Sequence, residues 1–160
     1  MSGKISEEEK YNLWKNNYTL YASYYLIPHG TRKSYSLEYI QKKIKKIFSI
    51  SDIEARKKLS LSLSDNIVFK MLSYDSKHVK KTIIDCMNIA YKKNKDYGSA
   101  NILDFGISGL LVRINDKIAR LINLQKIKSR SVKDETIEDT IKDIINYSIY
   151  IQMLAEDAWF

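Results

Sequence analysis

Residues 134–157, DETIEDTIKDIINYSIYIQMLAED, place apolar and polar side chains at helical spacing. At about 3.6 residues per turn, the apolar members cover roughly 100° of a helix surface. This apolar stripe consists of Ile137, Ile141, Ile144, Ile145 and Ser148. The opposite side holds Glu135, Asp139, Asp143, Asn146 and Tyr150. The segment therefore predicts an amphipathic helix that turns its isoleucines to a core and its polar side to water or to a ligand.

Three carboxylates on the polar side, Glu135, Asp139 and Asp143, recur at every fourth residue with no cation among them. Like charges at this spacing destabilise a helix by a few tenths of a kcal/mol per pair. Three environments would relieve the repulsion: bulk water, a divalent ion such as Mg²⁺ that binds carboxylate oxygens, or salt bridges from another helix. The sequence alone leaves these three alternatives open.

The preceding segment, GISGLLVRINDKIARLINL, supplies cations that could reach such a row. It predicts a helix over about 106–125, with Arg113, Lys117 and Arg120 along one flank and Asp116 beside them. We expect Asp116 to pair with Arg120 four residues later. Arg113 and Lys117 then remain for an external anion or for the acidic row.

The rest of the chain also indicates helices, since one proline and five glycines are few for 160 residues. Helical spacing predicts helices over about 6–26, 37–48, 51–73 and 77–94, with Ser6, Ser36, Ser51 and Ser76 at their starts. Loops are expected at 27–36, which contains Pro28 and Gly30, and at KIKSRSVKD (126–134). With the two helices above, the prediction is an all-α bundle of five to seven helices.

Composition places this bundle among globular proteins with a basic surface. The net charge is +8, and residues 1–80 carry most of it, with 15 Lys and Arg against 8 Asp and Glu. Such a surface attracts phosphates. No run approaches the roughly 18 apolar residues of a membrane helix, and the polar, acidic start does not resemble a signal peptide. The lone cysteine, Cys86, lies in an apolar run and is expected in the core, so we predict a cytoplasmic protein without membrane contact.

The segment KNKDYG (93–98) joins two of the predicted helices. Lys95 and Gly98 are typical of a helix C-terminus, where glycine adopts a positive φ and a cation complements the helix dipole. Gly106 and Gly109 follow at the start of the next helix, where they would permit a close approach of a ligand or another backbone. We expect a turn between two helices rather than a phosphate-binding loop.

The order KNKDYG, GISGLLVRINDKIARL and DETIEDTIKDIINY, over about residues 80–155, resembles the phage-type nucleotide modification associated domain, type 1. That family is in turn distantly similar to the all-α nucleoside triphosphate pyrophosphatases of the MazG and dimeric dUTPase kind. The resemblance implies an oligomeric helical protein that binds nucleotides, in which acidic motifs hold Mg²⁺ and activate water. It divides the chain into residues 1–75, a basic N-terminal helical arm or subdomain, and residues 76–160, a nucleotide-binding helical domain.

Carried over by position, the resemblance assigns roles to individual residues. The metal-binding set implied by the resemblance is Asp116, Glu135, Glu138, Asp139 and Asp143. Glu135 and Asp139 are the implied catalytic residues. The implied nucleotide-binding set is Lys95, Asp96, Tyr97, Arg113, Lys117, Arg120 and Asn146. The first acidic motif of the pyrophosphatases, an ExxE pair, has no counterpart in this chain.

Three functions follow from these residues. The first is a Mg²⁺-dependent (d)NTP pyrophosphohydrolase-like protein of a phage or mobile element. The second is a viral sponge, an anti-defence protein that sequesters a nucleotide-derived immune signal without hydrolysing it, because the first acidic motif is missing. The third is a nucleic-acid-binding accessory factor that uses the basic N-terminal half. Zinc sites, a Ser-His-Asp triad and a P-loop are excluded by the spacing of the residues that they require.

Overall fold

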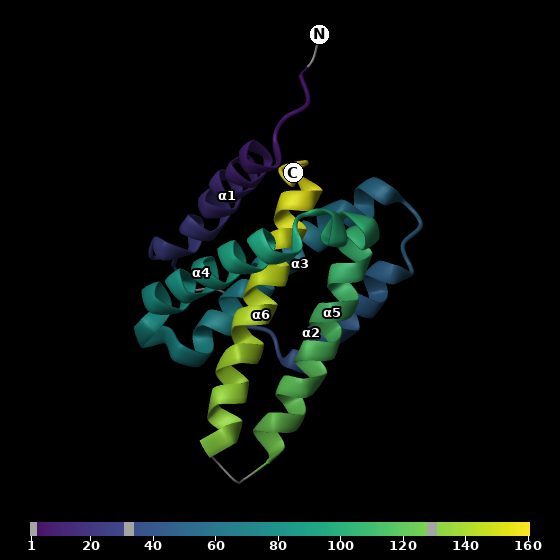
Figure 1. The fold of residues 1–160 in the computed structure, drawn as a ribbon. Helices are drawn as coiled ribbons and strands as arrows, with labels where there is room; N and C mark the ends of the chain where they lie inside the picture. The colour runs from purple at the N-terminus through teal and green to yellow at the C-terminus, as the bar shows by residue number, and fades with distance from the viewer. Residues whose placement is uncertain (1–2, 31–33, 128–130) are drawn as a thin grey trace.

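The structure, a computed structural model, describes residues 3–30, 34–127 and 131–160, and for residues 131–136 it describes the backbone only. These parts of the chain form an all-α bundle without strands, as predicted (Figure 1). The α-helices are α1 (Glu7–Ser23), α2 (Leu37–Phe48), α3 (Ile53–Leu72), α4 (Val79–Tyr97), α5 (Ala100–Lys126) and α6 (Ser131–Ala155). Two 3₁₀ helices extend α1 and α3, namely η1 (Tyr24–Leu26) and η2 (Ser73–His78).

Side-chain caps decide where the first three helices begin. Ser6 Oγ accepts a hydrogen bond from the Glu9 amide (3.1 Å) while Glu9 Oε2 accepts one from the Ser6 amide (2.9 Å), and this capping box starts α1. Ser36 caps α2 through the amide of Tyr39 (3.1 Å). Both starts confirm the prediction.

The predicted starts at Ser51 and Ser76 are wrong. Asp52, not Ser51, caps α3, because its carboxylate accepts the amide hydrogen of Ala55 at 2.9 Å. Ser76 lies inside η2, which leads directly into α4 at Val79. The C-terminal helix also begins earlier than expected, since residues 131–134, assigned to a loop from the sequence, already belong to α6.

Helix α6 lies at the centre of the bundle and packs against α1, α3, α4 and α5 (Figure 1). A helix that meets neighbours on several sides cannot keep a wide polar face. Asn146 and Tyr150, which we expected on the water-facing side, are only 4% and 6% exposed. The predicted core stripe is otherwise present, with Ile141, Ile144 and Ile145 buried.

Aromatic side chains pack between α1 and α6. The Trp14 ring stacks on Tyr18 with centroids 5.3 Å apart and meets Trp159, near the C-terminus, edge to face at 5.5 Å. Tyr150 of α6 contacts all three rings. One continuous core therefore contains residues from both sides of the boundary near residue 75, and the division into two domains stays a prediction.

The turn between α4 and α5 explains three of the glycines. Gly98 ends α4 with φ +72° and ψ −178°, and Gly106 kinks α5 with φ +58° and ψ −151°. Residues other than glycine rarely adopt these angles. Gly109 follows the kink, where a Cβ atom would overlap the Cβ of Phe105. Helix α5 therefore begins at Ala100, before the expected start at residue 106, and bends at Gly106.

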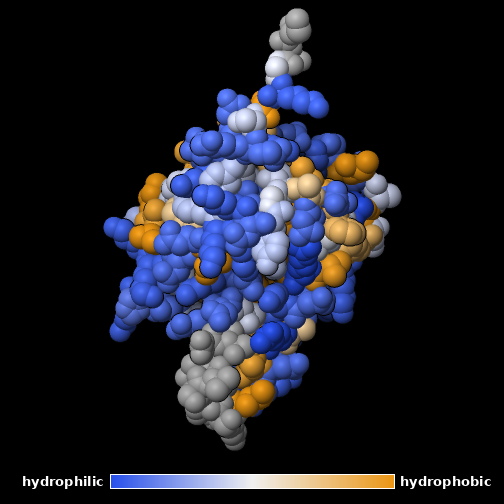
Figure 2. Space-filling model, viewed as in Figure 1, coloured by the Kyte–Doolittle hydropathy of each residue, from blue (hydrophilic) through white to orange (hydrophobic). Residues whose placement is uncertain are grey.

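The face shown in Figure 2 is mostly hydrophilic, with hydrophobic residues in separate small patches. Among the helices of the described ranges, none combines the length and the hydrophobicity that spanning a membrane requires.

We expect Gly106→Ala to lower the free energy of unfolding by about 1–3 kcal/mol, because alanine at this positive φ is strained. Urea denaturation followed by circular dichroism measures the change. Gly30→Ala is the matched control, since Gly30 has no positive φ and no atom near its added Cβ. Equal stability of the two variants would show that the kink at Gly106 is absent in solution.

Candidate functional site: a cavity between α4, α5 and α6

A cavity of about 250 Å³ lies where the C-terminal end of α4 meets α5 and α6. Its wall combines charged, amide and aromatic side chains. The lining residues are Lys93, Asn94, Tyr97, Gly98, Asn101, Ile102, Arg113, Asp143, Asn146, Tyr147, Tyr150 and Trp159. Three of the residues assigned to nucleotide binding from the sequence, Tyr97, Arg113 and Asn146, therefore meet in one cavity together with Asp143.

Asp143 is held by lysines from two other helices. Its Oδ1 lies 3.2 Å from Lys93 Nζ of α4, and its Oδ2 lies 3.0 Å from Lys117 Nζ of α5. The side chain of Asp143 is 20% exposed, so these ion pairs are partly shielded from water. For this member of the acidic row, interhelical salt bridges supply the neutralising charge.

Arg113 is the cation of the cavity that has no carboxylate partner among the described residues. Its guanidinium lies over the ring of Tyr147, 5.9 Å from the centroid, and the side chain is half-buried. A ring face holds a guanidinium in place without neutralising it. The planar donor group of Arg113 is therefore available to an anion.

Hydrogen bonds fix the back wall of the cavity. Asn146 Oδ1 accepts from the hydroxyl of Tyr18 at 2.6 Å, and its Nδ2 donates to the carbonyl of Cys86 at 3.1 Å. Asn94 Nδ2 donates to Ser99 Oγ at 3.1 Å, while its Oδ1 has no donor among the described residues. Asn146 thus shapes the wall with both ends of its amide occupied, whereas Asn94, which is 8% exposed, keeps one acceptor for a ligand.

Several residues assigned from the sequence lie outside this cavity. The Lys95 ammonium lies over the ring of Tyr11, 5.9 Å from its centroid, and Asp96 is exposed and does not line the cavity. The expected ion pair of Asp116 and Arg120 does not form: their charged groups are not within 4.0 Å of each other. Both are exposed on α5, where water competes for such a pair.

The predicted metal ligands are not gathered in one place. Glu138 and Asp139 are exposed on α6, and Asp143 is occupied by two lysines. The side chain of Glu135 lies outside the described residues. Within the described parts of the chain, no three His, Cys, Asp or Glu side chains are placed to hold a metal ion. Because Mg²⁺ in nucleotide sites often binds only one or two carboxylates together with the phosphates, the Mg²⁺ site stays a prediction.

Six lining residues escaped the sequence analysis: Lys93, Asn94, Asn101, Ile102, Tyr147 and Trp159. Tyr147 follows Asp143 by four residues, so helical spacing could have placed it on the same face. No sequence pattern placed Trp159 at the cavity, because it lies after the end of α6. Its indole Nε1 donates a hydrogen bond to the carbonyl of Ser99 at 3.1 Å.

Asn146→Ala is expected to lower the free energy of unfolding by about 1–3 kcal/mol, because the buried Tyr18 hydroxyl and Cys86 carbonyl lose their partner. Thermal and urea denaturation measure the loss. Asn101→Ala, at an exposed position of the same cavity, should leave stability within about 0.5 kcal/mol of the unchanged protein. A stable Asn146→Ala variant would contradict the structural role of this amide.

Cys86, behind the same wall, is fully buried, and burial raises the pKa of its thiol to about 12. The thiolate is the reactive form. We therefore expect a disulfide reagent at pH 8 to modify Cys86 only slowly in the native protein and rapidly after addition of urea, as followed by absorbance. Equally rapid modification in both states would show that the α4–α6 contact opens readily.

Comparison with known proteins is consistent with the order of motifs in the sequence. Residues 93–154 match the family model described as nucleotide modification associated domain 1, which confirms the resemblance over this segment. No curated protein and no solved structure matches the chain, so the more distant similarity to all-α nucleoside triphosphate pyrophosphatases stays a prediction.

Proposed function

We propose that this chain, whose residues 93–154 match the family model of nucleotide modification associated domain 1, binds a nucleotide in the cavity between α4, α5 and α6. The observation that carries the proposal is that the cavity and the matched segment coincide. Every lining residue except Trp159 belongs to residues 93–154. The rest of the chain supplies the core on which this segment is packed.

The lining residues match the parts of a nucleotide. Arg113 offers paired donors to a phosphate, and Lys93 adds positive charge at the same cavity. Tyr97, which is 75% exposed at the rim, and Tyr147 present aromatic rings on which a base can stack. The amides of Asn94 and Asn101 can hydrogen-bond the edge of that base. A volume of about 250 Å³ suits the base and sugar, with the phosphates toward the opening.

Retention of the intact nucleotide is favoured over its hydrolysis. Asp143 is engaged by Lys93 and Lys117, and Asp139, the other member of the row whose side chain is described, is exposed. Binding requires only the cations, amides and rings of the cavity. A protein of this kind would act by sequestering a nucleotide or a nucleotide-derived signal, as the anti-defence hypothesis expects.

Isothermal titration with the ribo- and deoxyribonucleoside mono- and triphosphates tests binding. We expect at least one nucleotide to bind, and Arg113→Ala to weaken it by about tenfold or more, as the loss of a charge-assisted contact predicts. Arg120→Ala is the matched control, because Arg120 lies on the same helix outside the cavity. Absence of binding by every nucleotide, or equal loss in both variants, would overturn the proposal.

The fate of the bound nucleotide is read from the same samples. After incubation with Mg²⁺ and heat denaturation, chromatography should recover the nucleotide unchanged and in stoichiometric amount. Release of a monophosphate and pyrophosphate would instead establish the pyrophosphohydrolase activity. Light scattering on these samples measures whether the protein forms the homo-oligomer that we also propose.

A further inference from the structure

A second pocket, of about 210 Å³, lies where α2 packs against α3 and α5. Four of its residues recur on α3 at positions 53, 56, 57 and 60, a spacing that places them on one face of that helix. The lining residues of this basic pocket are Ile47, Ile53, Arg56, Lys57, Ser60, Phe105, Ile107, Ser108 and Leu111. It shares none of them with the nucleotide cavity, and no function considered so far uses it.

The wall of the basic pocket is largely apolar. Ile47 and Leu111 are buried, with 4% and 1% of their surface exposed. Ile53 and Phe105 are 72% and 68% exposed, so both present large apolar side chains to water beside the pocket. An occupant that covers these side chains removes apolar surface from water, which favours binding. The pocket therefore suits a ligand with an apolar body.

Two cations of this pocket have no carboxylate partner. Arg56 and Lys57 are both partly buried, and within the described parts of the chain neither forms an ion pair. Arg56 Nη2 donates to Ser108 Oγ at 3.2 Å, and the guanidinium lies over the ring of Phe48, 5.8 Å from the centroid. These contacts orient the guanidinium without neutralising it. Because none of the described lining residues is acidic, the pocket favours an anion.

A buried hydroxyl in the same wall lacks a partner. Ser60 is 1% exposed, and its Oγ forms no hydrogen bond with any described group. A buried polar atom that stays unpaired costs stability. A hydroxyl either donates or accepts, whereas Arg56 and Lys57 only donate. An occupant that serves all three side chains is therefore one that accepts hydrogen bonds.

We propose that the basic pocket binds a small organic carboxylate on an apolar body, such as an arylalkyl or short aliphatic acid. A planar carboxylate accepts paired hydrogen bonds from the guanidinium of Arg56, and Lys57 adds a point charge. The isoleucines, Leu111 and Phe105 cover the apolar body. A volume of about 210 Å³ lies below the roughly 300–1,000 Å³ of drug-sized ligand sites, which limits the occupant to a small molecule.

The test uses 3-phenylpropanoate as probe, with 3-phenylpropanol and 3-phenylpropylamine as neutral and cationic analogues of the same body. Titration calorimetry or ligand-observed NMR on the full chain is expected to give the carboxylate a Kd of about 1 mM or below, as befits so small a molecule. The alcohol and the amine are expected to bind at least about tenfold more weakly, because neither offers a charged acceptor. Equal binding of the three probes, or no binding of the carboxylate, would overturn the proposal.

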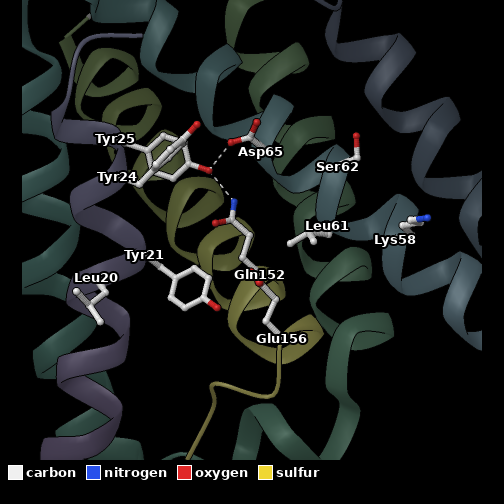
Figure 3. A pocket seen from close by; sticks show the side chains of 10 residues that line it. All are labelled: Leu20, Tyr21, Tyr24, Tyr25, Lys58, Leu61, Ser62, Asp65, Gln152 and Glu156. Atoms are coloured by element: carbon white, nitrogen blue, oxygen red, sulfur yellow. Dashed lines mark hydrogen bonds between the residues drawn. The ribbon is translucent and has the colours of Figure 1, made fainter.

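Lys57→Gln and Lys58→Gln form a matched pair of variants at neighbouring positions of α3. Lys57 lines the basic pocket, whereas Lys58 is exposed and lines a separate cleft between α1 and α3 (Figure 3). Lys57→Gln should weaken the carboxylate by about fivefold to tenfold, because one attracting charge is lost. Lys58→Gln should leave the affinity unchanged. Equal effects of the two variants would show that only the overall charge of the protein matters.

Ile53→Glu and Leu20→Glu form a second pair, because each replaces an apolar side chain that is 72% exposed. Ile53 is the first residue of α3, where an acidic side chain is favourable, so this variant should fold normally by circular dichroism. The new carboxylate repels the probe, and we expect Ile53→Glu to weaken it by about tenfold or more. Leu20→Glu, in the separate cleft of Figure 3, should not change the affinity.

The nucleotide cavity offers an alternative place for the probe, because Arg113 there could also pair with a carboxylate. Loss of probe binding in Arg113→Ala, with Lys57→Gln and Ile53→Glu unaffected, would place the probe in that cavity and contradict the inference. Loss of probe binding in Ile53→Glu, with nucleotide binding intact, would support it. Failure of one site is therefore distinguishable from failure of the other.

Discussion

Burial of α6 by four neighbouring helices is the constraint on which the rest of the structure depends. A helix packed in this way must satisfy each of its buried polar groups inside the protein. Ser148 does so with its own helix, donating to the carbonyl of Ile144 at 2.8 Å, whereas Asn146 and Gln152 reach α1, α4 and η1. Hydrogen bonds are directional, so these bonds fix the position of α6 along its neighbours more closely than apolar contacts alone would.

The nucleotide cavity and the cleft between α1 and α3 both arise from this arrangement. Where α6 passes between α4 and α5, Asp143 sits at the edge of the core and draws a lysine from each helix. Two turns further on, Gln152 lies against η1 and α3 and orients Tyr25 toward Asp65. One side of the central helix therefore collects cations and amides, and another side collects carboxylates and phenols.

The turn between α4 and α5 shows how backbone conformation serves the first of these sites. Gly98, with its positive φ, ends α4 directly before Ser99, and Gly106 kinks α5 seven residues later. Ser99 then accepts hydrogen bonds from Asn94 through its hydroxyl and from the Trp159 indole through its carbonyl. Gly98 therefore lies at the rim of the cavity, next to the hydrogen bonds that join α4 to the C-terminal segment.

The sequence by itself determined the helical class, the boundaries of α2, the capping box of α1, and the apolar stripe of α6, because these depend on spacing and on caps within a few residues. The motifs that match the nucleotide-associated family are equally local. Only the tertiary structure decided that Asn146 and Tyr150 are buried, that Asp143 pairs with lysines, and that Asp116 and Arg120 stay apart. Each of these depends on which helix lies opposite at a given turn. A periodicity along one helix says which residues share a face, but the partner of that face is set by packing across the whole chain.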